Sequence, residues 1–178
     1  MHAHPTCMKT TALVASAFLI TLSAPASAQA PDDAQIAAIV VTANQVDIDA
    51  GKLAAATTHN AEVKKFAQLM VTDHTGVNAR ATALVTRLKV TPEDNDTSRS
   101  LKDGGDKNLA ALKPLKGKAF DKAYVDHEVA YHQAVLDAID KTLIPNASNG
   151  DLKALLVKVR PAIAAHLEHA QHLQASLQ

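Results

Sequence analysis

The stretch that decides the fold is residues 63–88, VKKFAQLMVTDHTGVNARATALVTRL. Its apolar side chains recur at alternating steps of four and three residues, the spacing of a helix that packs against neighbouring helices. A single polar residue, His74, interrupts this stripe. The members of the stripe are Val63, Ala67, Met70, His74, Val77, Ala81, Leu84 and Leu88. The stretch therefore predicts a long, packed helix with one inward histidine.

Three further stretches predict helices, and two of them repeat this spacing. Residues 119–143 place one histidine, His132, among apolar positions at the same steps. The C-terminal stretch does so with His166. Residues 33–58 carry a broader apolar stripe, and Asp47 lies on its flank. Each predicted helix therefore contributes one titratable side chain.

Residues that typically begin or end helices predict where the four helices start and stop. Asn60 separates the first helix from the second, which we expect over residues 61–89. The third helix should stop before Pro145, and Asn149 should start the fourth. Pro161 should kink that last helix, because proline lacks an N–H and its ring crowds the preceding turn.

A long crossover joins the second and third helices. The segment from Pro92 to Gly117 is polar and is interrupted by Gly104 and Gly105. Glycine is a poor helix former, so we expect only a short helix there, around residues 107–113. The sequence thus predicts four long helices with a crossover between the second and the third.

The composition supports an all-α protein and excludes some partners. Alanine is abundant while aromatic residues make up 3% of the chain, a balance that favours closely packed helices over strands. Eighteen basic residues balance 18 acidic ones, and no basic run marks a nucleic-acid surface. We expect no nucleic-acid partner, while a protein partner or a homo-oligomer stays open.

The N-terminus predicts an export signal. Lys9 precedes an apolar run over residues 12–22, and the small residues 26–28 follow it. We expect cleavage after Ala28, which leaves one domain over residues 29–178 without cysteine or a membrane-spanning segment. The predicted compartment is the periplasm, with an outer-membrane association left open.

The four inward side chains lie at similar heights in the predicted helices. Asp47, His74, His132 and His166 are each 12 to 19 residues from the turn that joins their helix to its partner. Because a helix rises about 1.5 Å per residue, the four side chains could meet in one layer of a bundle. Three imidazoles and a carboxylate form a ligand set suited to zinc, copper or iron.

A second interpretation of the same residues needs no metal. Each histidine would then be a packing residue satisfied by a neighbouring side chain or water, and Asp47 would face solvent at the edge.

Two further residues could take part in a metal site. Met70, one turn before His74, could add a thioether ligand for copper. Glu128, one turn before His132, could serve as a ligand, a hydrogen-bond acceptor or a salt-bridge partner.

The remaining histidines are weaker candidates. His127 should point away from His132, and His172 should turn toward solvent. His169 also drifts toward solvent, although with His166 it could form a two-ligand edge.

The order of these residues resembles an exported bacterial ferritin-like family of unknown function, whose members are often labelled predicted outer-membrane proteins. The resemblance covers nearly all of the mature chain and implies a four-helix bundle with a long crossover between its second and third helices. It implies no established activity. The residues that carry it are Val63, Lys64, Phe66, Ala67, Met70, Val71, Asp73, His74, Thr75, Phe120, Asp121, Tyr124, Val125, His132, His166, Leu167 and Ala170.

Two departures bear on the chemistry that this resemblance implies. No Glu in the chain is followed three residues later by His, whereas di-iron members of the wider fold carry that pair on two helices. Asp47 stands where the resemblance implies a glutamate in the first helix. We therefore do not expect di-iron chemistry.

Two functional hypotheses remain. The first is a non-enzymatic exported bundle, a binding module or an envelope- or stress-associated protein, and it is the one the sequence favours. The second is a metal-binding or metal-dependent redox protein that uses Asp47, His74, His132 and His166. Convergence of the imidazole nitrogens to within about 5 Å would favour a shared metal ion.

Overall fold

The computed structural model describes residues 29–178, so the predicted export signal lies outside the described residues. Every regular element in that range is helical, as the composition predicted. None of these helices combines the length and the apolar character that crossing a bilayer needs. The elements are α1 (Asp33–Thr57), α2 (Ala61–Leu88), α3 (Asp96–Leu112), α4 (Gly117–Ala138), the π-helical η1 (Ile139–Leu143), α5 (Ile144–Asn146) and α6 (Gly150–Ser176).

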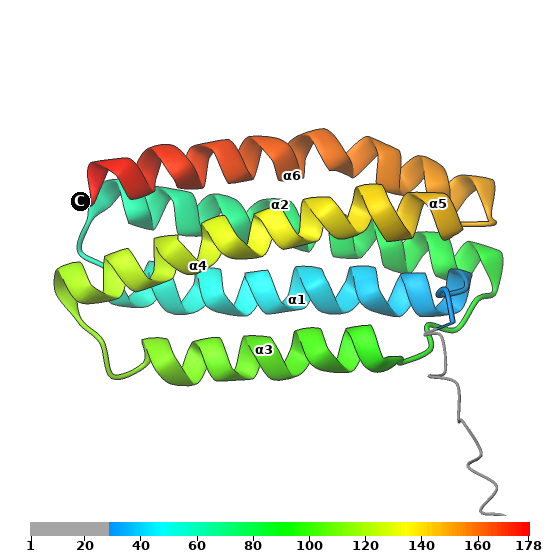
Figure 1. Cartoon of the computed structure of the whole chain (residues 1–178), viewed down its shortest axis with the longest axis horizontal. Helices are drawn as coiled ribbons and strands as arrows, with labels where there is room; N and C mark the ends of the chain where they lie inside the picture. The colour runs from blue at the N-terminus through cyan, green and yellow to red at the C-terminus, as the bar shows by residue number, and fades with distance from the viewer. Residues whose placement is uncertain (1–28) are drawn as a thin grey trace, which may run out of the picture.

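The long helices lie side by side with their axes nearly aligned (Figure 1). Helix α1 packs against α2, α4 packs against α6, and α2 also contacts α6. Helix α3 lies on the other side of α1 and hardly contacts α4. Asp47, His74, His132 and His166 are thereby carried on four different helices that surround one interior.

Side-chain caps fix where the helices begin. Asp32 forms a capping box with Gln35 at the start of α1, because each residue's side chain bonds the other's backbone N–H. Asn60 caps α2 and Asn149 caps α6, each by accepting from two backbone N–H groups. The predicted starts of these three helices are confirmed to within about one residue.

Helix α3 corrects the prediction for the crossover. It spans 17 residues and includes both glycines, whereas we expected a short helix around 107–113. Asn95 supplies a capping box at its start, which stabilises a helix despite its weak propensity. A Cβ atom on Gly105 would lie 2.8 Å from Val46 Cγ2, so the glycine is what allows α3 to approach α1 closely.

Pro145 lies within a continuing helix where we expected the helix to stop, and Pro161 lies inside α6. The helix begun by α4 continues through η1 and α5, past Pro145, instead of stopping before it. The wider π turn of η1 precedes Pro145, whose ring would crowd the carbonyl group of Lys141 in an ordinary α-helix. Helix α6 runs through Pro161 as one α-helix, with the proline on its exposed face.

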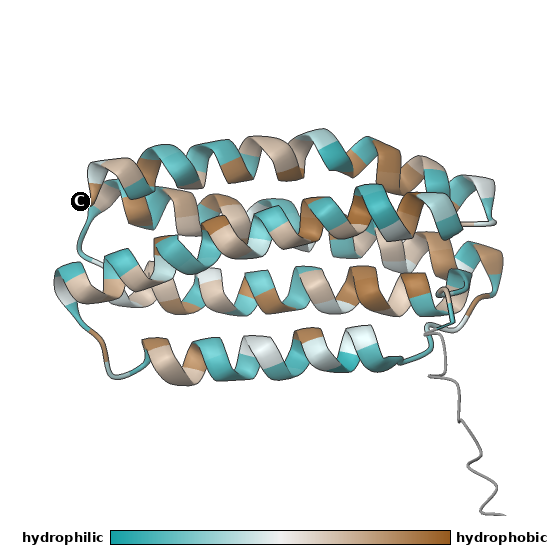
Figure 2. Ribbon diagram, viewed as in Figure 1, coloured by the Kyte–Doolittle hydropathy of each residue, from teal (hydrophilic) through white to brown (hydrophobic). Residues whose placement is uncertain are grey.

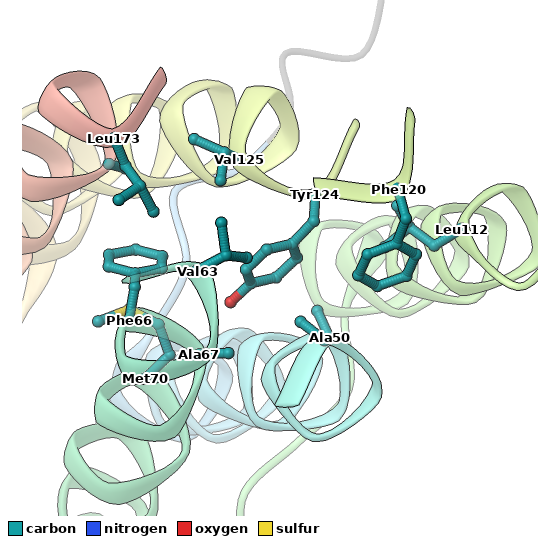
Figure 3. Close-up of a cluster of buried hydrophobic side chains, with 12 residues drawn as sticks. Ala50, Val63, Phe66, Ala67, Met70, Leu112, Phe120, Tyr124, Val125 and Leu173 are labelled. Atoms are coloured by element: carbon teal, nitrogen blue, oxygen red, sulfur yellow. The ribbon is translucent and has the colours of Figure 1, made fainter. Parts of the chain in front are cut away.

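Two separate apolar clusters fill the interior, and hydrophobic and hydrophilic residues alternate along the helices accordingly (Figure 2). We call the first the aromatic cluster, because Phe66, Phe120 and Tyr124 pack within it, fully buried (Figure 3). We call the second the aliphatic cluster. Its buried members are Ile36, Ile39, Val40, Ala81, Leu84, Ile139, Leu143, Ala147, Leu152, Leu156 and Ile163.

Candidate metal centre

The structure brings the four predicted residues together in the interior. Asp47 from α1, His74 from α2, His132 from α4 and His166 from α6 are all buried, with exposed fractions between 1% and 5%. Asp47 is 1% exposed, so the interpretation in which it faces solvent at the edge of the bundle is wrong. Packing of α2, α3 and α4 around α1 covers the side of α1 that sequence reasoning left at the edge.

The three imidazoles converge. One ring nitrogen from each of His74, His132 and His166 lies within 4.8 Å of the corresponding nitrogens of the other two. The ring centroids are separated by 5.2 to 5.7 Å. These nitrogen separations fall within the limit of about 5 Å expected for a shared metal ion. Ligand atoms about 2.1 Å from one metal ion lie about 3 to 4 Å from one another.

The Asp47 carboxylate lies against two of these rings. Its Oδ2 atom is 2.8 Å from His74 Nε2 and 3.3 Å from His132 Nε2. Burial raises the pKa of Asp47, but the contact with His74, together with the neighbouring imidazoles of His132 and His166, outweighs it, so the pKa lies below its ordinary value. The interior therefore holds an ionised carboxylate beside the imidazoles.

Hydrogen bonds on the outer side of the rings of His74 and His132 determine their tautomers. The Nδ1 of His132 donates to the backbone carbonyl oxygen of Glu128 over 3.0 Å. His74 Nδ1 lies 2.7 Å from the side-chain oxygen of Asn44, and the amide nitrogen of Asn44 donates to the carbonyl oxygen of Val40. Because amide oxygens only accept, both Nδ1 atoms carry the hydrogen, and in each neutral ring Nε2 keeps a free lone pair.

The outer hydrogen bond of His166 is made by Nε2 instead of Nδ1. Its Nε2 atom lies 2.9 Å from Oδ2 of Asp73, which is partly exposed at the edge of α2. A carboxylate accepts the Nε2 hydrogen, so the free lone pair of neutral His166 is on Nδ1. Acceptors on the far side of each ring are the usual way in which proteins orient histidines that bind a metal.

The atoms that face one another have no hydrogen-bond partners. His74 Nε2, His132 Nε2, His166 Nδ1 and both carboxylate oxygens of Asp47 are buried and unpaired. A lone pair on His74 Nε2 and a carboxylate oxygen 2.8 Å away repel each other unless a cation or a proton lies between them. The donor set therefore fits a metal ion.

Burial keeps two of the rings in the neutral form that a metal requires. It lowers the pKa of His132 to about 4, and the neighbouring His74 and His166 act in the same direction. It also lowers the pKa of His166, against the opposing effect of Asp73. Both imidazoles are therefore unprotonated at neutral pH and can offer a nitrogen to a cation.

Glu128 lies beside His132, at the position from which the sequence allowed it to act as a ligand, an acceptor or a salt-bridge partner. It is 1% exposed, and both of its carboxyl oxygens lack a hydrogen-bond partner. Burial and the charge of Asp47 raise the pKa of Glu128 well above its ordinary value, which disfavours the role of a plain salt-bridge partner. Atoms of Glu128, Asp47 and His132 also lie within 4.8 Å of one another, next to the three imidazoles.

The weaker candidates lie elsewhere. Met70 packs in the aromatic cluster beside Phe66, as Figure 3 shows. His169 sets its ring edge-on to Phe66, with centroids 5.0 Å apart. His172 is exposed and pairs with Glu168, while His127 stacks on Tyr131. None of the three outer histidines belongs to the clusters with metal-ligand spacing found within residues 29–178.

Sequence reasoning missed Asn44 and Asp73, the acceptors for His74 and His166. Asn44 lies one turn before Asp47 on the same helix, and Asp73 is next to His74 in the chain. A search for acceptors one turn from each predicted ligand could have found Asn44. The position of Asp73 opposite α6 depends on how the two helices pack, so no local signal indicates it.

Comparison with known proteins gives a fold and a family. The solved structure of CopM in the Cu(II)-bound form is similar, with a TM-score of 0.67, 14% sequence identity, and coverage of 84% of this chain and 100% of that one. At this identity the likeness concerns the fold. No curated protein matches the chain. The model of a domain of unknown function, DUF4142, matches residues 21–173, and the chain therefore belongs to that family.

Proposed function

We propose that this protein is an exported helical-bundle protein that binds one divalent transition-metal ion through His74, His132 and His166, with Asp47 as the fourth ligand. The observation that carries the proposal is the set of buried, unpaired donor atoms that face one another from four helices. A cation among them would relieve the repulsion between lone pairs and neutralise a buried carboxylate.

Copper(II) is the ion that we expect to bind most tightly. Neutral imidazoles and a carboxylate suit zinc, copper and iron, and copper(II) stands highest in affinity for nitrogen and oxygen ligands among the divalent metals of the first row. The likeness in fold to CopM, whose solved structure is a Cu(II)-bound form, supports testing copper first. The only cysteine in the sequence is Cys7, so residues 29–178 offer no thiolate that would favour copper(I).

The wider role that we propose is non-enzymatic metal binding in the periplasm. The predicted export signal over residues 1–28 supports that compartment, and the four long helices with a crossover support a ferritin-like bundle. The chain lacks the Glu-x-x-His pairs of di-iron proteins. The site would therefore hold a single ion between helices, either to stabilise the bundle or to carry the metal.

The test is metal analysis of residues 29–178, purified without a histidine tag and then titrated with Cu²⁺ and Zn²⁺ against a competing chelator. We expect about one ion per chain, with affinity at least about 100-fold weaker in each of His74→Gln, His132→Gln and His166→Gln. Glutamine keeps much of the side-chain volume, and circular dichroism checks the fold of each variant. The matched control is His172→Gln, an exposed histidine on the same helix as His166, which should bind like the parent.

Asp73→Ala provides a finer test, because Asp73 touches the proposed centre only through His166. Loss of an outer acceptor of this kind typically weakens metal affinity about 10- to 100-fold. A folded parent that takes up neither metal would overturn the proposal. So would a parent in which NMR shows His74 protonated at neutral pH beside Asp47, because a proton would then satisfy the pair.

A further inference from the structure

An apolar cavity of about 140 Å³ lies beside the candidate metal centre, within the aliphatic cluster. Helices α1, α2, α4 and α6 all contribute to its wall. The lining is almost wholly aliphatic. It includes Ile39, Val77, Val135, Leu143, Leu156 and Ile163.

The polar side chains at the inner end of this cavity are those of the candidate centre. Asn44, Asp47, His74 and His132 all line it. Their polar atoms are directed to one another or to the outer acceptors, so the remaining wall offers few groups that could bind water. A buried water molecule needs about two to four polar partners, and apolar cavities of about 150 Å³ stay dry and admit benzene or xenon.

A groove on the surface leads toward the cavity. It lies between α3 and α4, and Thr97, Leu101 and Tyr131 line both the groove and the cavity. Tyr131 bridges the gap between α4 and α1, because its hydroxyl donates to the carbonyl oxygen of Ala43 over 2.8 Å. Helices α3 and α4 hardly contact each other, and Tyr131 is the α4 side chain that lines both the groove and the cavity.

We propose that this cavity is a binding site for a small, uncharged, apolar molecule no larger than a single aromatic ring. The volume limits the size, and the aliphatic walls exclude charged or strongly polar occupants. Such a molecule would enter from the groove past Tyr131 and come to rest against His74, His132 and Asp47. Its placement next to a metal ion rests on the proposed function, whereas its binding to the metal-free protein does not.

The experiment titrates benzene, and separately xenon, into metal-free residues 29–178 and follows side-chain methyl groups by NMR. We expect saturable shifts at Ile39, Leu156 and Ile163, which line the cavity. The methyl groups of Val63 and Leu173, in the aromatic cluster, should stay unchanged. Absence of saturable shifts, or equal shifts in both clusters, would overturn the proposal.

A matched pair of variants on α4 sharpens the result. Ala138 lines the cavity, and Ala138→Leu should fill part of it and weaken benzene binding at least about tenfold. Ala130 is exposed on the same helix and lies outside the cavity, so Ala130→Leu should bind like the parent. Equal binding by both variants would contradict the proposed location.

His166→Gln separates this proposal from the proposed function. His166 is in the imidazole cluster but does not line the cavity. The variant should lose the metal and keep benzene binding, while Ala138→Leu should keep the metal and lose benzene binding. A protein that binds the metal but no benzene would overturn the cavity proposal alone, and the reverse result would overturn the metal proposal alone.

Discussion

The two apolar clusters differ in how completely they fill their share of the interior. The aromatic cluster packs Phe66, Phe120 and Tyr124, each 0% exposed. The aliphatic cluster contains only branched and small side chains, and it borders a cavity of about 140 Å³. Rigid rings fill the gaps between helices more completely than the aliphatic side chains do here. The difference indicates that one cluster stabilises the bundle while the other leaves room beside the candidate centre.

The largest expected effect comes from breaking the aromatic cluster. Phe66→Ala should lower the free energy of unfolding by about 3 to 5 kcal/mol, because it opens a void among fully buried neighbours. Leu155→Ala, at a partly buried position that borders the existing cavity, should cost about 1 to 2 kcal/mol. Urea denaturation of the metal-free variants measures both. Equal losses would contradict the difference between the clusters.

The second prediction concerns the layer of titratable groups and its dependence on pH. Burial lowers the pKa of His132 from 6.5 to about 4 in the folded protein. Between these values the unfolded chain binds more protons, so the contribution of His132 to stability is full above pH 6.5 and falls as the pH drops toward 4. The stability of the metal-free parent relative to His132→Gln should therefore fall by about 3 kcal/mol over that window.

Denaturation midpoints measured at a series of pH values for both proteins check this prediction. Titratable groups far from His132 behave alike in the parent and the variant, so their effect cancels in the difference, whereas Asp47 and Glu128 contact His132 and contribute to it. A difference that does not change with pH would show that His132 keeps its ordinary pKa.

The third prediction tests how closely α3 approaches α1. Gly105→Ala should destabilise the protein by about 1 to 2 kcal/mol, because the new methyl group would meet Val46 at 2.8 Å. Gly104→Ala is the matched control, since a Cβ atom there has no neighbour within 4 Å and alanine favours the helix by up to about 1 kcal/mol. Thermal unfolding of the two variants should give shifts in midpoint of opposite sign. Stabilisation by both substitutions would contradict the close contact.

The smallest expected effect is that of Glu128→Gln. Burial raises the pKa of Glu128 well above 4.5, so the folded protein keeps a proton that the unfolded chain releases as the pH rises. The stability of the parent therefore falls with increasing pH, and glutamine removes this cost. We expect the metal-free variant to be more stable by about 1 kcal/mol at neutral pH, with less difference in acid. A destabilised variant would show that the carboxylate contributes a needed interaction.

Most of the helical pattern could be predicted from local signals. The steps of four and three residues in α2, the cap at Asn60 and the cap at Asn149 all act within one or two turns. The long α3 could not be predicted in this way. Its glycines argue against a helix, and its stability depends on the Asn95 cap together with a close contact between Gly105 and Val46.

The candidate centre likewise has some properties that the local sequence predicts and others that depend on how the helices pack. The sequence by itself determined that His74, His132 and His166 point inward at similar heights, because each interrupts an apolar stripe whose period is set by helix geometry. Only the tertiary structure decided that Asp47 is buried against two of them, that burial raises the pKa of Glu128, and that Asn44 and Asp73 orient the rings. These properties depend on which helices become neighbours and how much water they exclude, and contacts between distant residues are not encoded in a local period.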